Sequence, residues 1–336
     1  MKKYGKIFLV GLTILLVMFT ASSLVSLEVS PEPSSKVLSQ VVFRAESKIT
    51  DQDSYEKQIK QVQVEKDLTY TSKFKNNTFD LYLPKNQKKI TDLVIWVHGG
   101  GYVGGDKMQI EEFASRLVAD TNVAFIAMNY ELAPDSKYPN QVNQLNDLIT
   151  YLQGNKGKYP MDMSKIFLGG DSAGAQIALQ YANLASNERY ANRMDFKTSI
   201  DRKDIRGTIS YCGPVDLAAF VKEHGDNQIW NYLLRNISWS ITGDKRWKTS
   251  QNIKEASIVE NIDKDFPPTY VTDGNFYSFS DQGKALVAKL NDLGVDNKGR
   301  FFNKKELTPH EYQFNYKNKS ALVCYEDTVS FINEYK

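Results

Sequence analysis

A serine lies among small residues in the stretch IFLGGDSAGAQIALQ, residues 166–180. Gly170, Ser172 and Gly174 form a G-x-S-x-G pattern between an apolar run that is typical of a strand and a run with helical spacing. In a tight strand-to-helix turn, the flanking glycines prevent collisions, and the serine oxygen projects clear of the sheet. A serine hydroxyl is a weak nucleophile until a neighbouring base takes its proton. The pattern therefore predicts a nucleophilic serine with a base nearby.

A second glycine cluster, HGGGYVGGD, begins at His98 and directly follows another apolar run. Acyl transfer needs hydrogen-bond donors aimed at the oxyanion that develops in the transition state. Consecutive glycines let backbone N–H groups turn inward without obstruction by side chains. We expect donors from the backbone of Gly100, Gly101 and Ala173. Gly99 belongs to the same loop, and His98 is expected to brace it by hydrogen bonding.

Three motifs together resemble the hormone-sensitive-lipase-like branch of the α/β-hydrolase superfamily. HGGGYVGGD, NYELAPDSKYP (129–139) and GGDSAGAQIA (169–178) occur in the order of that branch, and the resemblance covers residues 68–336. It implies a serine hydrolase that cleaves carboxylic esters without metal or cofactor. It also implies that His310, in LTPHEYQF after the last expected strand, is the general base. We expect His224 to belong to the surface or to a cap.

The acid of a serine–histidine–acid triad is missing from the place that the family uses. There the strand ends in glycine and the acid follows three residues later, whereas here Gly274 is followed at that distance by Tyr277. A phenol cannot balance an imidazolium as a carboxylate does. Asp281 is our first choice, because one helical turn could bring its carboxylate back. Asp273 and Asp216 remain alternatives, and so does a site without an acid.

Strand-like and helix-like runs alternate from residue 68 onward, and these elements must position the residues above. Such alternation predicts a mostly parallel central sheet flanked by helices, and the resemblance implies that this sheet has the α/β-hydrolase fold. In sheets of this kind, chemistry lies at the carboxyl ends of the strands, where the glycine clusters occur. The expected strands are 78–84, 92–99, 122–130, 165–170, 206–213, 268–274 and 299–305, and helices are expected at 139–153 and 321–335.

An insertion at about 217–266 is expected to form a small helical cap. Its aromatic residues would make the core of the cap, and some of them would wall the acyl pocket, since ligand sites are mostly apolar. These residues are Phe220, Trp230, Tyr232, Trp239 and Trp247.

The first residues differ in character from the rest of the chain. Lys2, Lys3 and Lys6 precede a charge-free apolar run at residues 7–27. This pattern predicts an export signal or an uncleaved membrane anchor. We therefore expect a catalytic domain outside the cytoplasm, either membrane-anchored or secreted. Residues 28–66 are expected to form a linker with a possible cap helix, and residues 67–336 the hydrolase domain.

Composition narrows the functional classes. The 336-residue chain has a formal charge of +2, which does not suggest a nucleic-acid partner. Cys212 and Cys324 lie in apolar runs and are expected to be buried free thiols, with a disulfide as the alternative.

The favoured function is an esterase for small acyl groups that works through an acyl-enzyme. An amidase or peptidase using the same site and a catalytically weakened binding protein are the alternatives, the second favoured by Tyr277.

Overall fold

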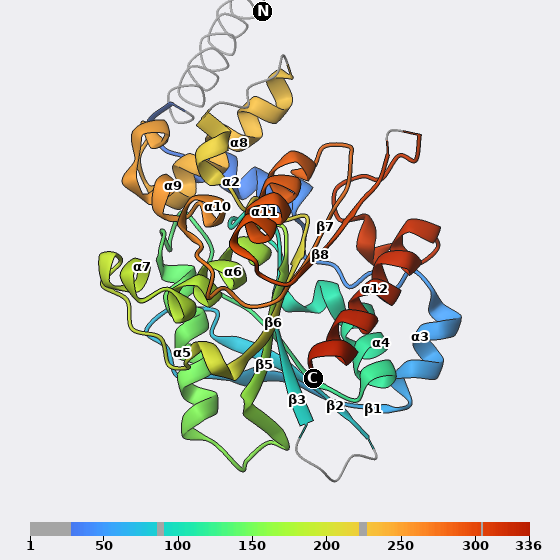
Figure 1. The fold of residues 1–336 in the computed structure, drawn as a ribbon. Helices are drawn as coiled ribbons and strands as arrows, with labels where there is room; N and C mark the ends of the chain where they lie inside the picture. The colour runs from blue at the N-terminus through green and yellow to red at the C-terminus, as the bar shows by residue number, and fades with distance from the viewer. Residues whose placement is uncertain (1–27, 86–90, 222–226, 304) are drawn as a thin grey trace, which may run out of the picture.

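The computed structural model describes residues 28–85, 91–221, 227–303 and 305–336 (Figure 1). Within these residues, eight strands form one sheet in the order β1-β2-β4-β3-β5-β6-β7-β8. β2 pairs antiparallel with its two neighbours, and all other pairs are parallel. The expected α/β-hydrolase fold is confirmed. The strands are β1 (Val62–Thr69), β2 (Thr78–Pro84), β3 (Thr91–Val97), β4 (Ala124–Met128), β5 (Met161–Asp171), β6 (Ile205–Tyr211), β7 (Thr269–Asp273) and β8 (Asn297–Phe301).

Successive side chains of the central strand β3 enter two separate hydrophobic cores. Leu93, Ile95 and Val97 join the core on one face of the sheet, and Val94 and Trp96 join the core on the other. All five side chains are fully buried. A strand covered on both faces needs apolar residues at every position, which explains the unbroken apolar run in its sequence.

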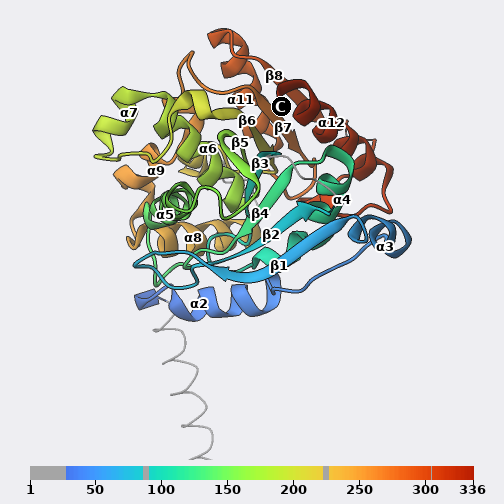
Figure 2. The ribbon, with the colours of Figure 1, turned by 90° about the horizontal axis from the view of Figure 1, so that it is seen from below.

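Helices cover both faces of the sheet (Figure 2). The first core contains residues of α5 (Asn140–Gly154), α6 (Ala173–Ser186) and α11 (Ser280–Leu293). The second contains residues of α4 (Glu111–Thr121) and α12 (Lys319–Tyr335). Two shorter helices, α3 (Gln52–Ile59) and α7 (Glu188–Arg193), pack against α4 and α6 respectively.

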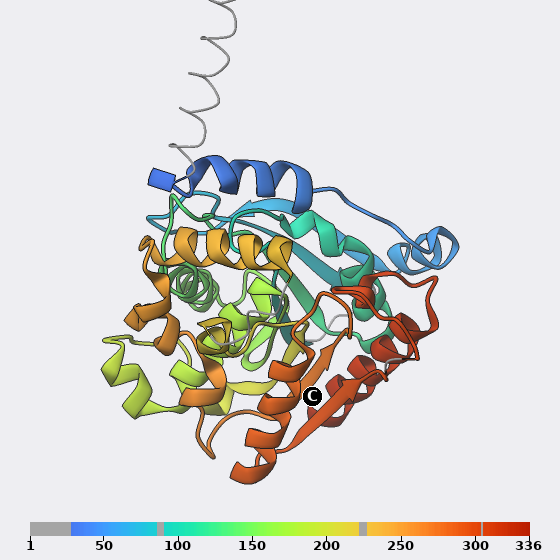
Figure 3. The ribbon, with the colours of Figure 1, turned by 90° about the horizontal axis from the view of Figure 1, so that it is seen from above.

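A cap lies over the carboxyl ends of the strands. Between β6 and β7 the chain forms α8 (Gln228–Thr242), α9 (Gln251–Glu255), α10 (Ile258–Asn261) and two short 3₁₀ turns. The N-terminal helix α2 (Glu32–Val37) continues as a π-helical turn (Leu38–Val42). Figure 3 shows α2 beside α8. The N-terminal segment therefore adds a helix to the cap.

Hydroxyl groups join the two neighbouring helices of the cap. The Oγ atom of Ser34 lies 3.0 Å from the Tyr232 hydroxyl, and that of Ser35 lies 2.7 Å from the Ser240 Oγ. Because these serines are buried, their hydroxyl groups need such partners.

The sheet begins earlier than the sequence suggested. β1 starts at Val62, inside the segment expected to be linker and helix, so the expected boundary at residue 67 falls within a strand. β1 is an edge strand that pairs only with β2, and most of its side chains are partly exposed, which explains its polar sequence.

The expected anchor (1–27) and His224 lie outside the described residues. Among the residues that are described, no helix has the length and apolar character needed to cross a bilayer.

Candidate active site

Ser172 lies at the sharp turn between β5 and α6. Its backbone has φ 49° and ψ −121°, a strained conformation for a residue with a side chain. The neighbouring glycines are required by close approach of the chain. A Cβ atom on Gly174 would lie 2.0 Å from the Val97 oxygen, and one on Gly170 would lie 2.4 Å from the Gly174 carbonyl carbon. The turn therefore packs tightly against the end of β3 and holds Ser172 in place.

The structure brings the expected nucleophile and the expected base together. The Nε2 atom of His310 lies 3.0 Å from the Oγ atom of Ser172. The His310 backbone N–H donates to the Phe276 oxygen at 3.1 Å, and the Phe279 ring meets the imidazole edge-on, with centroids 5.5 Å apart. Desolvation by the surrounding protein lowers the pKa of His310 to about 4. The imidazole is therefore neutral near pH 7 and able to accept a proton.

The glycine loop after β3 presents unused backbone donors near Ser172. Gly100 and Gly101 have φ angles of 109° and 59°, in the region that favours glycine. A Cβ atom on Gly100 would lie 2.2 Å from the Gly104 oxygen. Within the described part of the chain, the N–H groups of Gly100, Gly101 and Ala173 have no hydrogen-bond acceptor. They are therefore free to serve a developing oxyanion.

His98 braces this loop from inside the fold. Its side chain is 1% exposed, and its ring stacks on Tyr130 with centroids 4.4 Å apart. The Nδ1 atom lies 2.6 Å from the Gly99 oxygen. Because a carbonyl can only accept, Nδ1 carries the proton. Burial lowers the pKa of His98 to about 4, which keeps the ring neutral in this bracing position.

Two carboxyl groups that the sequence analysis did not single out, those of Asp171 and Glu311, lie close to Gly99 on its other side. Asp171 accepts hydrogen bonds from the Gly99 N–H at 2.8 Å and from the Trp96 indole at 2.7 Å. A Cβ atom on Gly99 would lie 2.4 Å from Asp171 Oδ2 and 2.8 Å from Glu311 Oε1. Burial raises the pKa of Asp171 to about 6, and burial with repulsion from Asp171 raises that of Glu311 to about 8. Their only signal in the sequence is position, directly before Ser172 and directly after His310.

The structure does not support the choice of Asp281 as the triad acid. Its side chain is 91% exposed and pairs with Lys284 at 3.2 Å. The helix that should have turned it inward begins only one residue earlier, so the carboxylate points to solvent instead of His310. Asp216 also has another role, because its carboxylate accepts the backbone N–H of Ala219 at 3.2 Å at the start of a 3₁₀ turn.

The Nδ1 atom of His310 meets Ser278, whose Oγ atom lies 2.9 Å away. The Ser278 hydroxyl in turn donates a hydrogen bond to Asp273, which is 1% exposed at the end of β7. Burial raises the pKa of Asp273 to about 7, and hydrogen bonds, that of Ser278 first, oppose the rise. Tyr277 has φ 48° and turns its phenol toward Asn227, which donates to it at 2.9 Å. The residue at the usual place of the acid therefore faces the cap.

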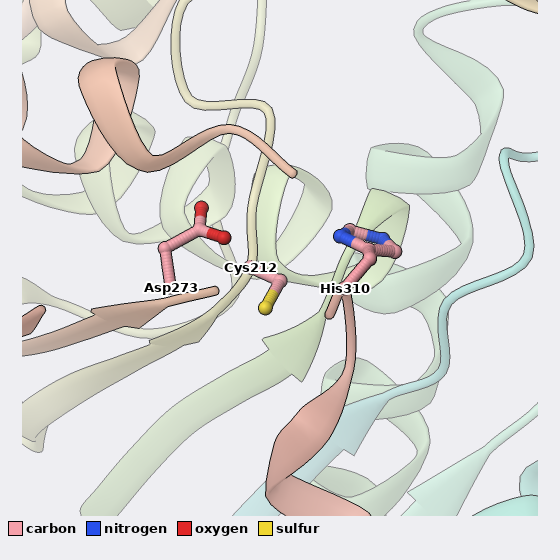
Figure 4. Close-up of side chains that lie close together, drawn as sticks. All are labelled: Cys212, Asp273 and His310. Atoms are coloured by element: carbon pink, nitrogen blue, oxygen red, sulfur yellow. The ribbon is translucent and has the colours of Figure 1, made fainter. Parts of the chain in front are cut away.

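Figure 4 shows the Cys212 side chain between those of Asp273 and His310. One ligand atom each from Cys212, Asp273 and His310 lie within 4.8 Å of one another, and all three residue types can bind metals. The thiol accepts from the Gln313 amide at 3.0 Å, and burial raises its pKa well above the usual value. Ser278 already bonds both Asp273 and His310. The three groups are thus engaged within the protein. Both cysteines of the chain are buried free thiols, as expected.

Two cavities meet at His310, and one of them also touches Ser172. A larger, more polar one of about 360 Å³ touches Gly99, Gly100, Asp171, His310 and Glu311. An apolar one of about 70 Å³ is walled by the glycine loop, the cap and the N-terminal segment. The lining residues of the apolar cavity are Phe43, Gly101, Tyr102, Ser172, Ala173, Pro214, Phe220, Trp230, Leu233, Leu234, Ile237, Phe279 and His310.

Sequence comparisons agree with this architecture. An Acanthamoeba polyphaga mimivirus protein assigned to the α/β hydrolases is 27% identical over 235 residues, which cover 67% of this chain and 62% of that protein. An acetyl esterase of Salmonella paratyphi B is 30% identical over 105 residues, 31% of this chain and 32% of the esterase. The chain thus matches less than two thirds of the length of these curated relatives.

Solved structures share the fold over nearly the whole chain. Esterase B from Lactobacillus rhamnosis superposes with a TM-score of 0.69 and 17% identity, covering 96% of this chain and 95% of the esterase. The resemblance to α/β hydrolases of the carboxylesterase branch is confirmed. Residues 79–290 match the family model BD-FAE. Since this match spans well over half of the sequence, the chain belongs to the BD-FAE family of α/β hydrolases.

Proposed function

We propose that the protein is a serine carboxylesterase that cleaves esters of short acyl groups through an acyl-enzyme. The observation that carries the proposal is the 3.0 Å contact between Ser172 Oγ and His310 Nε2. A nucleophile within hydrogen-bond reach of a neutral base, on a strained turn, is the arrangement that nucleophilic catalysis needs. The free N–H groups of Gly100, Gly101 and Ala173 add the donors that acyl transfer requires.

The reaction would proceed in two halves. Ser172 Oγ attacks the ester carbonyl while His310 Nε2 takes the serine proton, and the negative oxygen accepts the free backbone donors. His310 then returns that proton to the leaving alcohol, and an acyl-enzyme remains. In the second half His310 takes a proton from the water that attacks the acyl group, and it then gives this proton to Ser172 Oγ as the carboxylic acid leaves.

The size of the apolar cavity argues for a short acyl group. Its volume is about 70 Å³, against about 360 Å³ for the polar cavity, so the apolar side of the site offers the smaller space. The relatives agree with a short chain, because one is named an acetyl esterase and esterase B has been solved with a tributyrin phosphonate. The leaving alcohol would then occupy the larger polar cavity beside Glu311.

Replacement of the nucleophile tests this function. Ser172→Ala should abolish hydrolysis of p-nitrophenyl acetate and labelling by a fluorophosphonate probe, because only an activated serine reacts with the probe. Ser186→Ala, at the far end of α6, is the matched control and should keep both. Residual turnover of Ser172→Ala within about tenfold of wild type would contradict a serine mechanism. Labelling of wild type without ester turnover would favour the amide-cleaving alternative.

We also propose that the N-terminal segment holds the catalytic domain to a membrane, outside the cytoplasm. The apolar sequence that precedes Glu28 supports this. So does α2 with its π-helical turn, which buries Ser34 and Ser35 while Val37 and Val41 are 60% and 74% exposed. Leu38 of the same segment is buried in the core, but the exposed valines give the segment an apolar outer face that is unusual for a surface helix in water. Cell fractionation with protease digestion of intact cells tests it, and full-length chain in the soluble cytosol would contradict it.

A further inference from the structure

We propose that Asp273 is the acid of this site and acts on His310 through the hydroxyl group of Ser278, which makes Ser278 a positioning residue of the reaction. This inference rests on the proposed serine hydrolase function. It is carried by two hydrogen bonds, from the Ser278 hydroxyl to Asp273 and between Ser278 Oγ and His310 Nδ1.

Backbone contacts fix the loop of Ser278 against the loop of His310. The Asn275 N–H donates to the Thr308 oxygen at 2.8 Å, and the His310 N–H donates to the Phe276 oxygen at 3.1 Å. The two segments approach so closely that a Cβ atom on Gly274 would lie 2.5 Å from the Thr308 oxygen. The position of the Ser278 hydroxyl beside the imidazole is therefore set by main-chain pairing.

The direction of each hydrogen bond follows from its acceptor. An ionised Asp273 can only accept, so Ser278 donates to it, and the lone pairs of Ser278 Oγ accept the Nδ1–H of His310. This places the ring proton on Nδ1 and leaves Nε2 free to accept from Ser172. As Ser172 attacks, Nε2 gains the serine proton, while Nδ1, Ser278 and Asp273 keep their protonation states. The charge of Asp273 stabilises the imidazolium through a polarised hydroxyl group.

Other groups around His310 do not supply this charge at Nδ1. Glu311 lies 3.9 Å from Nε2, the opposite side of the ring, and burial raises its pKa to about 8. The Cys212 thiol, at the end of β6, is held neutral by burial. Asp273 is the buried carboxyl that a hydrogen-bond chain connects to Nδ1.

Turnover of matched variants tests the connection. Ser278→Ala and Asp273→Asn should each lower kcat for p-nitrophenyl acetate on the order of 10²- to 10⁴-fold, up to the loss that follows removal of the acid in other serine triads. Ser278→Thr keeps a hydroxyl and should stay within about tenfold of wild type. Asp281→Asn, on the solvent-facing side of the same segment, is the control and should leave kcat unchanged. Thermal melts show which variants fold.

The double variant distinguishes a connected chain of hydrogen bonds from two groups that act independently. If Asp273 acts only through Ser278, the double variant Asp273→Asn with Ser278→Ala should have a kcat close to that of the less active single variant. The reason is that the effects of residues that act as a unit do not add. Effects that multiply would overturn the proposal. So would a folded Ser278→Ala that keeps wild-type turnover.

A spectroscopic test avoids dependence on turnover. The chain has three histidines, so nitrogen spectra of ¹⁵N-histidine protein can be assigned by subtraction with His310→Gln. Wild type should show His310 protonated on Nδ1 near neutral pH, and Ser278→Ala should shift the ring toward a mixture of tautomers. An unchanged tautomer in Ser278→Ala would overturn the inference. If wild type shows the Nδ1 tautomer but hydrolyses no ester, the proposed function fails and the chain of hydrogen bonds stands.

Discussion

The hydrogen bonds around His310 assign each ring nitrogen one partner. Ser172 lies at Nε2 and Ser278 at Nδ1, so the imidazole lies between two hydroxyl groups, that of the proposed nucleophile and that of the proposed link to Asp273. The carboxylate behind Ser278 is buried, and its ionisation therefore costs more than that of an exposed acid. If Asp273 is the acid, this cost should make the activity depend on pH near neutrality.

We predict that kcat/KM falls as the pH drops below about 7. The pKa of Asp273 is raised to about 7, whereas that of His310 is lowered to about 4, so the first proton taken up by the pair removes the charge that His310 needs. Activity should thus rise as the pH increases through this range. Asp273→Asn should show low activity without that step. The same step in Asp273→Asn would show that another group titrates.

A second residue-scale prediction concerns the glycine loop. Gly100→Ala should lower kcat by about 10²-fold or more, because its Cβ atom would meet the Gly104 oxygen at 2.2 Å and displace an oxyanion donor. Gly157→Ala is a matched control, since Gly157 also has a positive φ of 90° but no atom within 4 Å of its Cβ position. Backbone strain alone should affect both melting temperatures. Equal losses of kcat would remove the loop from the mechanism.

Most strands of the sheet were predictable from sequence, and the edge strand β1 was not. The expected strand at 92–99 corresponds to β3 and the expected helix at 139–153 to α5, because buried elements carry unbroken apolar or periodic runs. The sequence did not predict β1, because an edge strand can carry polar side chains.

The proposed nucleophile and base were recognisable from sequence, whereas the proposed acid, Asp273, was only one of several alternatives. Ser172 and His310 stand where their local motifs place them. The path from Asp273 to His310 instead depends on a loop in which Tyr277 adopts a left-handed conformation and turns toward the cap. Spacing along the chain does not encode that turn, because few residues other than glycine and asparagine signal a positive φ. The pairing of Asp171 with Glu311 likewise depends on tertiary contact.

The cap helix α8 should set the acyl chain length. Ile237 lines the apolar cavity, and its Cδ1 atom lies 3.0 Å from the point where a Gly101 Cβ atom would be. Ile237→Ala should enlarge the cavity and raise the kcat/KM ratio of p-nitrophenyl hexanoate to acetate about tenfold or more, since single methylene groups give such discrimination. Ile241→Ala makes the same change in the buried core of this helix and should leave the ratio unaltered. A ratio unaltered in Ile237→Ala would place the acyl group elsewhere.

Several buried ionisable groups of the molecule lie together at the carboxyl ends of the strands. Asp171, Asp273 and Glu311 have raised pKa values, and His98 and His310 have lowered ones, with burial as the largest cause in each case. Every one of these shifts favours the uncharged form. The folded state therefore favours protonated carboxyl groups and neutral imidazoles. As the pH rises through their pKa values, the carboxyl groups lower the free energy of unfolding and the imidazoles raise it.

The melting temperature should fall between about pH 7 and about pH 8.5, and Glu311 should be the cause. A carboxyl group with a raised pKa holds a proton in the folded state that the unfolded chain has lost, so its contribution is complete below the unfolded value and disappears as the pH rises through about 8. The two histidines change stability only between about pH 4 and about pH 6.5, and the raised pKa values of Asp171 and Asp273, about 6 and about 7, lie below that of Glu311.

Glu311→Gln tests this assignment, because an amide keeps the shape of a protonated carboxyl group and cannot ionise. The variant should melt at nearly the same temperature at about pH 7 and about pH 8.5, whereas wild type should melt lower at the higher pH. Glu188→Gln, on the exposed surface of α7, should behave like wild type. A decline that persists in Glu311→Gln would show that another group causes it and would contradict the assignment to Glu311.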